Sequence, residues 1–411
     1  MNEFIQLAYV GSVVPDDSEY HNEAFSPAGN MFQENLLAGL QAAGTPPSLV
    51  LSCRPMPAFP RSSRLAVRCS RGRLSCGIPL SLVPFINISP AKQLLLGVVV
   101  FLRLLWWGWV HRAAKTRIVY TFNLTVPPAL FTWLAARCIG ARAVASVNDI
   151  NEPGANVPRT WPWRLDYALH KILLPRFDAL VVVNGAIIDD FAPRSRYVCV
   201  EGGILPEMAA EAHLEGARKS NCFSVVFAGR MKAANGVDVM LQAIAQLKGE
   251  HYRFVFAGDG PLAEAVWRAA SEDSRIEYHG CLKVSDLLPI YKQADVLINM
   301  RLTKALRTRY FFPSKLMELL ASGTPVISTC PAQVEEEFGD FLFPLKRETP
   351  EGLAAAIRKV ETAGLEIRRE MGKRARAFML EHKTWQAQTG RISALLEGLA
   401  GEVAEGRDSC R

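Results

Sequence analysis

Short apolar runs alternate with amphipathic stretches along the first half of the chain. One stretch, NMFQENLLAGLQAAG, repeats its apolar residues every three or four positions, which predicts a helix ending at Gly44. Further helices are predicted at 129–141 and 163–177. Strands are predicted at 4–12, 117–122, 142–149, 178–185 and 196–204. Alternating strands and helices of this kind predict a parallel sheet that is covered on both faces.

The same alternation restarts in the second half of the chain. Strands are predicted at 223–229, 252–261, 275–280, 295–300 and 324–329. Helices are predicted at 237–249, 262–270, 284–294, 312–323, 351–364 and 366–380. A length of 411 residues exceeds what one hydrophobic core usually supports, so we expect two α/β domains. The boundaries predicted are 1–205, a polar linker at 206–221, 222–384, and a terminal helix with a polar tail at 385–411.

The charged residues are unevenly distributed. Between Glu34 and Asp149 there is no Asp or Glu, but there are thirteen Lys and Arg, whereas the whole chain carries only +7. Six arginines of this acid-free segment are concentrated in residues 54–73. Nine cysteines without a CxxC pair or zinc spacing, and a first segment without a basic leader, predict reduced thiols in a cytosolic protein.

Residues 93–115 contain the longest apolar run of the chain. Its apolar part, Leu94 to Val110, is interrupted by Arg103 and carries Trp106, Trp107 and Trp109 near its end. This run is short and broken for a membrane span, and it suits either a helix buried beside a sheet or an interfacial helix on an anionic membrane. No nucleic-acid motif accompanies the basic residues, and the aromatic residues are not interleaved with the arginines, so we expect no nucleic-acid partner.

The segment RYFFPSKLMELLASGTPVIST begins a predicted helix in an unusual way. Pro313 suits the first helical turn, and Ser314 is predicted to cap the helix. Lys315 adds a cation where free backbone N–H groups favour an anion, and Glu318 lies about one turn further on. A helix start with Lys fits a diphosphate, and a carboxylate fits ribose hydroxyls. An ordinary capped helix, with Glu318 stabilising its positive end, is the alternative.

Five segments in the second half resemble the carboxyl-terminal domain of family 4 retaining glycosyltransferases. These segments are FAGRMKAANGVDVMLQAI, FVFAGDGPL, IEYHGCL, YKQADVLINMRLT and FPSKLMELLASGTPVIST. The NxRxT pattern before FPSK resembles the bacterial capsule and exopolysaccharide branch. The amino-terminal half is similar only in an early glycine loop, in SPAGNMFQENLLAGL and in VEGGI. The resemblance implies the GT-B fold, in which two Rossmann-like domains face a cleft. It also implies that the first domain binds the acceptor and the second binds the nucleotide-sugar.

The resemblance implies donor-binding roles where residues match the family pattern. Glu318 matches the second of two glutamates and is expected on the ribose, whereas Tyr310 replaces the first. Arg230 matches the arginine that binds phosphate, and Asn235 replaces its usual lysine partner, for which Lys315 or Lys232 is expected to compensate. The remaining candidates are Gly11, Gly258, Gly260 and Ser314.

The predicted chemistry is sugar transfer from a UDP- or GDP-linked donor to a saccharide acceptor, with retention of the anomeric configuration. Arg230 and Lys315 are predicted to stabilise the departing diphosphate, because cations aimed at developing negative charge lower the barrier. Asp149 is the candidate for orienting the acceptor hydroxyl, with a capping role as the alternative, and His21 is a weaker candidate. The dispersed histidines and the lack of an Asp-x-Asp motif predict neither a metal nor a cofactor.

Exopolysaccharide synthesis implies an acceptor carried on a membrane lipid diphosphate. We therefore expect peripheral attachment to the anionic inner face of the cell membrane. A sugar-nucleotide epimerase of the same fold and a non-catalytic nucleotide-binding subunit remain alternatives. A Rossmann dehydrogenase is disfavoured, because YVGSVVPD lacks GxGxxG after the first strand.

Overall fold

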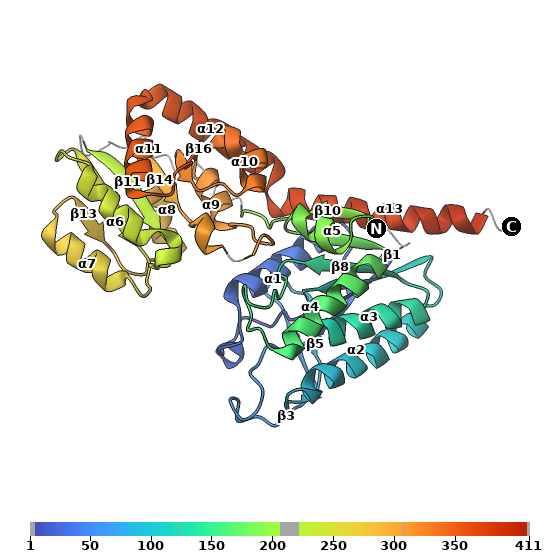
Figure 1. Ribbon diagram of the computed structural model, residues 1–411. Helices are drawn as coiled ribbons and strands as arrows, with labels where there is room; N and C mark the ends of the chain where they lie inside the picture. Colours follow the sequence, from blue (N-terminus) through green and yellow to red (C-terminus); the bar gives the residue numbers. More distant parts are fainter. Residues whose placement is uncertain (1–4, 124, 206–221, 307, 409–411) are drawn as a thin grey trace. The chain divides into compact units, whose positions relative to one another are not determined.

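The computed structural model describes residues 5–123, 125–205, 222–306 and 308–408; for Ala332 and residues 402–408 it describes the backbone alone. The chain forms two compact units, drawn in Figure 1. Unit 1 comprises Met1–Gly202 and Trp385–Arg411, and unit 2 comprises Gly203–Thr384. The linker predicted at 206–221 lies outside the described residues.

Unit 1 is built on an eight-stranded sheet in the order β10-β9-β8-β7-β1-β2-β5-β4. The strands are β1 (Ile5–Gly11), β2 (Pro47–Ser52), β4 (Ser70–Arg73), β5 (Pro79–Leu82), β7 (Thr116–Phe122), β8 (Arg142–Val147), β9 (Ala179–Val182) and β10 (Tyr197–Cys199). Neighbouring strands are parallel except for β4 and β5. A two-stranded antiparallel ribbon, β3 (Ala66–Val67) with β6 (Phe85–Ile86), stands apart from this sheet.

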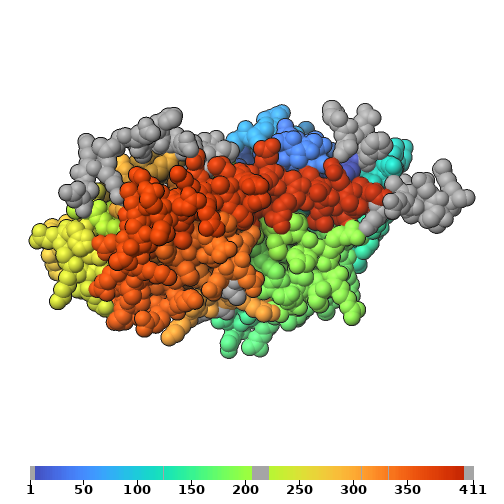
Figure 2. All heavy atoms as spheres, turned by 90° about the horizontal axis from the view of Figure 1, so that it is seen from above, coloured from blue at the N-terminus to red at the C-terminus, as the bar shows by residue number. Residues whose placement is uncertain are grey.

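The helices of unit 1 cover its sheet. They are α1 (Pro27–Ala42), α2 (Ala91–Val110), α3 (Val126–Cys138), α4 (Trp161–Leu173), α5 (Gly185–Phe191) and α13 (Trp385–Asp408), with short 3-10 turns at Ser18–Tyr20 and Leu174–Arg176. Figure 1 shows α2, α3 and α4 side by side, and α3 contacts both of the others. The last helix, α13, packs against α1 of the same unit, and Figure 2 shows it in red along its length. Its residues Ile392, Leu396 and Leu399 complete the core of unit 1.

Unit 2 is built on six parallel strands in the order β13-β12-β11-β14-β15-β16. They are β11 (Phe223–Ala228), β12 (Tyr252–Ala257), β13 (Ile276–Tyr278), β14 (Val296–Asn299), β15 (Val326–Ser328) and β16 (Phe343–Pro344). The helices are α6 (Val237–Gln246), α7 (Ala263–Glu272), α8 (Val284–Gln293), α9 (Lys315–Ala321), α10 (Ala332–Phe338), α11 (Pro350–Thr362) and α12 (Gly364–His382). Short 3-10 turns lie at Ala233–Asn235, Thr303–Ala305 and Gly339–Phe341.

The strand order of each unit contains one reversal of direction. In unit 2 the chain moves from β11 outward through β12 and β13, then returns to the other side of β11 at β14. In unit 1 the same reversal lies between β1 and β7. In open parallel sheets, ligands bind outside the carboxyl ends of the strands at such reversals. The loops that follow β11 and β14, and those that follow β1 and β7, are therefore the first places to look for a site.

Candidate active site

Arg230 and Lys232 follow β11 at the reversal of the unit 2 sheet. The side chain of Arg230 is exposed, and that of Lys232 is half-buried. Burial, together with the charges of Arg301 and Arg230, lowers the pKa of Lys232. Within the described part of the chain, no ion pair joins any of these three cations to a carboxylate. The reversal therefore gathers three positive charges that have no ion-pair partner among the described residues.

Arg301 reaches this cluster from β14, and the sequence analysis assigned it no role. Its guanidinium lies 3.9 Å from the centre of the Phe311 ring, and its backbone N–H donates to Thr329 Oγ1 at 3.0 Å. The next residue, Leu302, donates its N–H to the carbonyl of Ala234 in the β11 loop at 3.0 Å. This backbone bond fixes the two loops together, and burial lowers the pKa of Arg301. The signal available in the sequence was the arginine of NxRxT directly after a buried strand.

Asn235, which replaces the expected lysine, holds the β11 loop in shape. Its side-chain amide donates to the carbonyl of Arg230 at 2.8 Å. Gly236 follows in the left-handed region at φ 67°, and a Cβ there would meet Met300 Sδ at 2.5 Å. The position therefore stabilises the loop and adds no charge. Two residues were expected to compensate for the missing lysine. The charge of Arg230 acts on Lys232, whereas Lys315 interacts with the charge of Glu318.

Lys315 and Glu318 form a half-buried pair at the start of α9. Burial lowers the pKa of Lys315, and the charge of Glu318 partly offsets this effect. Burial raises the pKa of Glu318, again partly offset by its partner. Each charge is thus held where solvent stabilises it poorly. This arrangement fits groups that bind a polar ligand.

Two expectations about the start of α9 were wrong. The helix begins at Lys315 instead of Pro313, and Ser314 makes no side-chain capping hydrogen bond. At φ −51° and ψ −31°, Ser314 already has helical geometry, whereas a capping residue needs an extended backbone to direct its oxygen at free N–H groups. The Ser314 side chain is exposed. Tyr310, at the position of the first family glutamate, is buried.

Gly258 and Gly260 allow two backbone loops to pack closely. Gly258 has φ 134°, and a Cβ there would lie 1.9 Å from the carbonyl oxygen of Gly229. Gly260 has φ 152°, and a Cβ there would meet Met231 O at 2.5 Å. The loops after β11 and β12 are also joined by the Met231 N–H, which donates to Asp259 O at 2.9 Å. The structure therefore assigns these glycines to loop–loop packing beside Arg230, and a ligand-contacting role stays a prediction.

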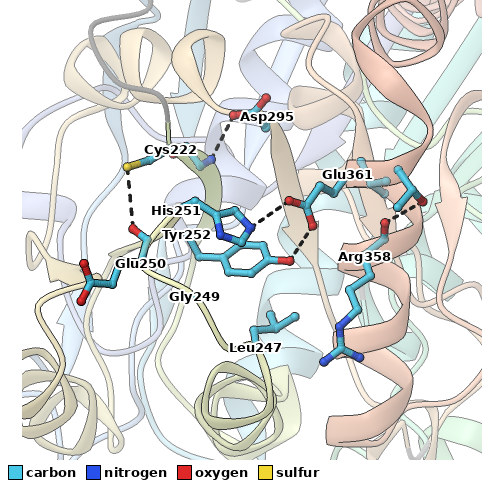
Figure 3. A network of polar contacts seen from close by, with 12 residues as sticks. Cys222, Leu247, Gly249, Glu250, His251, Tyr252, Asp295, Arg358 and Glu361 are labelled. Atoms are coloured by element: carbon cyan, nitrogen blue, oxygen red, sulfur yellow. Dashed lines mark hydrogen bonds and ion pairs between the residues drawn. The ribbon is translucent and has the colours of Figure 1, made fainter.

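The opposite edge of the same sheet is different, because its charged groups are paired. Figure 3 shows Glu361 of α11 accepting hydrogen bonds from His251 at 3.0 Å and from the hydroxyl of Tyr252 at 2.5 Å. Asp295, directly before β14, pairs with Arg368 at 3.2 Å. These pairs contrast with the three cations at the reversal, which have no ion-pair partner among the described residues.

In unit 1, the carboxyl ends of the strands carry Gly11 and Asp149. Gly11 is the last residue of β1, where a Cβ would meet Gln33 Oε1 at 2.4 Å, so this glycine serves close packing of β1 against α1. Asp149 follows β8, and desolvation raises its pKa while a hydrogen bond from Asn123 partly offsets this. Asn123, after β7, has φ 43° and accepts the backbone N–H groups of Asn148 and Asp149 at 3.2 and 3.0 Å.

One weaker candidate, His21, remains, and its role in the reaction stays a prediction. His21 lies on the surface, with its ring stacked on that of Phe25 at 4.8 Å. Across the residues that the structure describes, no group of three or more His, Cys, Asp or Glu side chains is arranged to hold a metal ion. The expectation of no metal and no cofactor stays a prediction.

Helix α2 has one buried face and one exposed apolar face. Leu96, Val100, Leu104 and Trp107 are buried. The exposed apolar residues recur about every four positions: Leu94, Val98, Leu102, Trp106, Trp109 and Val110. Trp107 belongs to the core, where its Nε1 donates to Ser48 Oγ at 3.0 Å. Among the described residues α2 is the one helix long and apolar enough to cross a membrane, but its buried face packs within unit 1.

Helix α4 carries a second exposed apolar row. Trp161, Leu165 and Ile172 are 72%, 49% and 52% exposed, and their spacing places them along one side of the helix. Contiguous exposed apolar surface of this kind marks interaction sites with proteins or membranes. Of the alternatives for residues 93–115, the structure shows a helix that packs within unit 1 and is exposed along one face, and contact of that face with a membrane stays a prediction.

Comparisons with known proteins agree with this geometry. Residues 222–362 match the family model described as glycosyl transferases group 1. No curated protein sequence matches the chain. The fold is similar to sucrose-phosphate synthase from Thermosynechococcus elongatus, with TM-score 0.65, 14% identity, and coverage of 97% of this chain and 100% of that one.

Two further structures extend the likeness. Anabaena HepE in complex with UDP has TM-score 0.66 and 13% identity, with 96% and 100% coverage. The lipopolysaccharide outer core galactosyltransferase WaaB has TM-score 0.62 and 12% identity, with 96% and 99% coverage. At these identities the likeness concerns the fold, which is GT-B. The family match covers the unit that contains Arg230, Lys315 and Glu318. The chain therefore has the GT-B fold, and its second unit carries a glycosyl transferases group 1 domain.

Proposed function

We propose that the chain is a retaining glycosyltransferase that moves a sugar from a UDP-linked donor to a lipid-linked saccharide acceptor in cell-surface polysaccharide synthesis. The observation that carries the donor site is the cluster of Arg230, Lys232 and Arg301 without a carboxylate partner among the described residues. A diphosphate supplies the missing negative charge. The solved structures of HepE with UDP and with UDP-glucose favour UDP over GDP.

In the proposed reaction the bond between the sugar and the diphosphate breaks, and its electron pair passes to the diphosphate. The three cations stabilise that growing negative charge, and the loss of one comparable donor costs about 3–4 kcal/mol. Glu318 accepts hydrogen bonds from the ribose hydroxyls. The acceptor hydroxyl forms the new bond to the sugar and gives up its proton to the departing diphosphate, and Asp149 is our candidate for orienting that hydroxyl.

Donor hydrolysis tests this proposal most directly. The purified chain is incubated with a panel of UDP- and GDP-sugars, and the released nucleotide is measured. We expect turnover with a UDP-sugar, and proton NMR of the first-formed sugar should show the donor's anomeric configuration. No turnover with any donor contradicts a catalytic role and favours a nucleotide-binding subunit. A product of inverted configuration contradicts retention.

We also propose peripheral attachment to the anionic cytoplasmic face of the cell membrane. The exposed rows of α2 and α4 supply apolar side chains, and the acid-free segment supplies cations that are each worth about 1 kcal/mol near an anionic surface. Because salt screens charges but not apolar insertion, high salt should release the protein only in part. Complete release by salt contradicts insertion of the apolar rows.

A further inference from the structure

A cationic pocket lies at the carboxyl end of β2 in unit 1. Its volume is about 560 Å³, and its charged lining residues are Glu19, Glu23, Arg54, Arg61 and Arg64. The N–H of Cys53, beside Arg54, donates to the carbonyl of Gly11 at the end of β1 at 2.8 Å. The pocket therefore opens at the edge of the sheet where parallel strands place their ligands. None of the residues that the family resemblance singled out lines it.

Arg54 is the buried wall of this pocket. Its side chain is 6% exposed, and its guanidinium lies 4.4 Å from the centre of the Tyr20 ring. Its Nη2 donates to the carbonyl of Glu19 at 2.8 Å, whereas its Nε has no hydrogen-bond partner. A buried N–H without an acceptor costs free energy, so each such group in a native structure needs an explanation.

The charges of the pocket are only partly balanced. The Glu19 carboxylate lies 3.8 Å from Arg54 and 3.9 Å from Arg64, which are long distances for ion pairs. Arg61 and Arg64 are exposed on the loop that closes the pocket. Three arginines of the lining face two carboxylates, Glu19 and Glu23, and Glu19 is shared between two of the arginines, so the pocket keeps an excess of donors for an anion.

The loop that carries Arg61 and Arg64 also presents apolar side chains to solvent. Phe59 is 47% and Leu65 is 48% exposed, and the neighbouring Ile86 and Ile88 are 48% and 44% exposed. The backbone joins these residues, because the N–H of Phe59 donates to Asn87 O at 2.8 Å. The β6 strand also contacts α2, so this apolar rim leads to the helix with the exposed row.

We propose that this pocket binds the diphosphate of the lipid that carries the acceptor, with Arg54, Arg61 and Arg64 as its donors and with Phe59, Leu65, Ile86 and Ile88 against the lipid. The inference rests on the lipid-linked acceptor of the proposed function and specifies its binding site. A prenyl diphosphate combines the two chemistries that meet here, since it is an anion joined to an apolar chain. A free phosphate would leave the apolar rim uncovered.

Farnesyl diphosphate is a suitable probe for the full chain by titration calorimetry, in the presence of saturating UDP to occupy the donor site. We expect it to bind more tightly than inorganic pyrophosphate and than farnesol. The double variant Arg61→Ala, Arg64→Ala should lose at least tenfold in affinity. A matched double variant, Arg68→Ala, Arg71→Ala, removes two exposed arginines of the same segment that do not line the pocket, and should bind as wild type does.

Arg54→Lys keeps the charge but lacks the unpartnered Nε, and it should also bind more weakly. Its melting temperature is recorded, and the surface double variant decides the question if this buried variant does not fold. Equal affinity in the two double variants overturns the proposal. An equal loss of binding to anionic phospholipid vesicles without diphosphate also overturns it, because the pocket would then recognise headgroup charge.

Donor hydrolysis by the wild-type chain is measured separately. An absent turnover with intact farnesyl diphosphate binding refutes the proposed function and leaves the pocket standing. Intact turnover with no difference between the double variants refutes the pocket alone.

Discussion

The two units both gather cations, but they differ in the apolar side chains that they expose. Unit 2 concentrates cations at the reversal of its sheet and pairs the charges at the opposite edge. Unit 1 also holds partly balanced cations, in the pocket of Arg54, Arg61 and Arg64, and in addition it exposes rows of apolar side chains along α2 and α4. In the described part of unit 2 the large exposed apolar residues form no row: Trp267 lies on α7, and Ile367 and Leu380 lie near the two ends of α12. Cations alone call for an anion, whereas cations beside apolar rows call for an anion joined to a lipid or to a protein surface, so the two units suit different ligands.

The largest effect is expected from Arg230→Ala, which removes the exposed cation at the end of β11. We expect kcat/KM for donor hydrolysis to fall roughly 100-fold or more, because a lost electrostatic donor costs about 3 kcal/mol in the transition state. The control is Arg268→Ala, an arginine that pairs with Glu264 on the exposed side of α7. Wild-type turnover in the Arg230 variant would place the leaving group elsewhere.

Arg301→Ala should weaken UDP binding about tenfold, which corresponds to ~1.4 kcal/mol. The side chain lies on Phe311, so the variant also tests whether it serves packing alone. In that case the melting temperature changes while the dissociation constant for UDP, measured by calorimetry, stays constant. Lys304→Ala, in the exposed turn that follows, is the matched control and should bind UDP normally.

The double variant Trp106→Ser, Trp109→Ser should lower binding to anionic liposomes by about tenfold in co-sedimentation, since interfacial binding scales with buried apolar area. Trp107 is left intact because it belongs to the core. Trp267→Ser is the counterpart in unit 2, where one tryptophan is 61% exposed without an apolar row. A similar loss in both variants would remove the difference between the units on which the membrane proposal depends.

The smallest effect concerns pH. Burial raises the pKa of Glu318, so its contribution to stability is present at low pH and is lost as pH rises through that pKa. Glu318→Gln should therefore have a slightly higher melting temperature than wild type at pH 8. The difference should shrink toward pH 5, and UDP binding should weaken. If the difference in melting temperature between the variant and wild type grew as the pH was lowered, the folded protein would stabilise the ionised carboxylate instead.

Much of the architecture could be predicted from the periodicity of apolar residues, but the strands within residues 45–90 could not. Strands such as β7 and β11 are continuous apolar runs, so their positions were predicted closely. The β4 strand reads SRGR and pairs with β5, and β3 and β6 have two residues each. Strands this short and polar show no alternation of apolar and polar residues, because they form through pairing with their neighbours. The arginine pocket was missed for this reason.

At the candidate site, proximity along the chain was predictable and proximity between strands was not. Lys315 and Glu318 are three residues apart, so a helix places them on one side. Arg301 lies beside Lys232 only because β14 returns next to β11, which is a property of strand order. The glycine loops were recognised, but the backbone of Gly229 that requires them was not visible in the sequence.

The return of α13 to unit 1 has a consequence for synthesis on the ribosome. Unit 2 is one continuous segment, Gly203–Thr384, with its ends joined by a hydrogen bond from Ile204 N–H to Lys383 O at 2.8 Å. Unit 1 needs Ile392, Leu396 and Leu399 to fill its core. The domain that emerges first from the exit tunnel therefore waits for the last helix to be translated, while the domain encoded between its two parts is already complete.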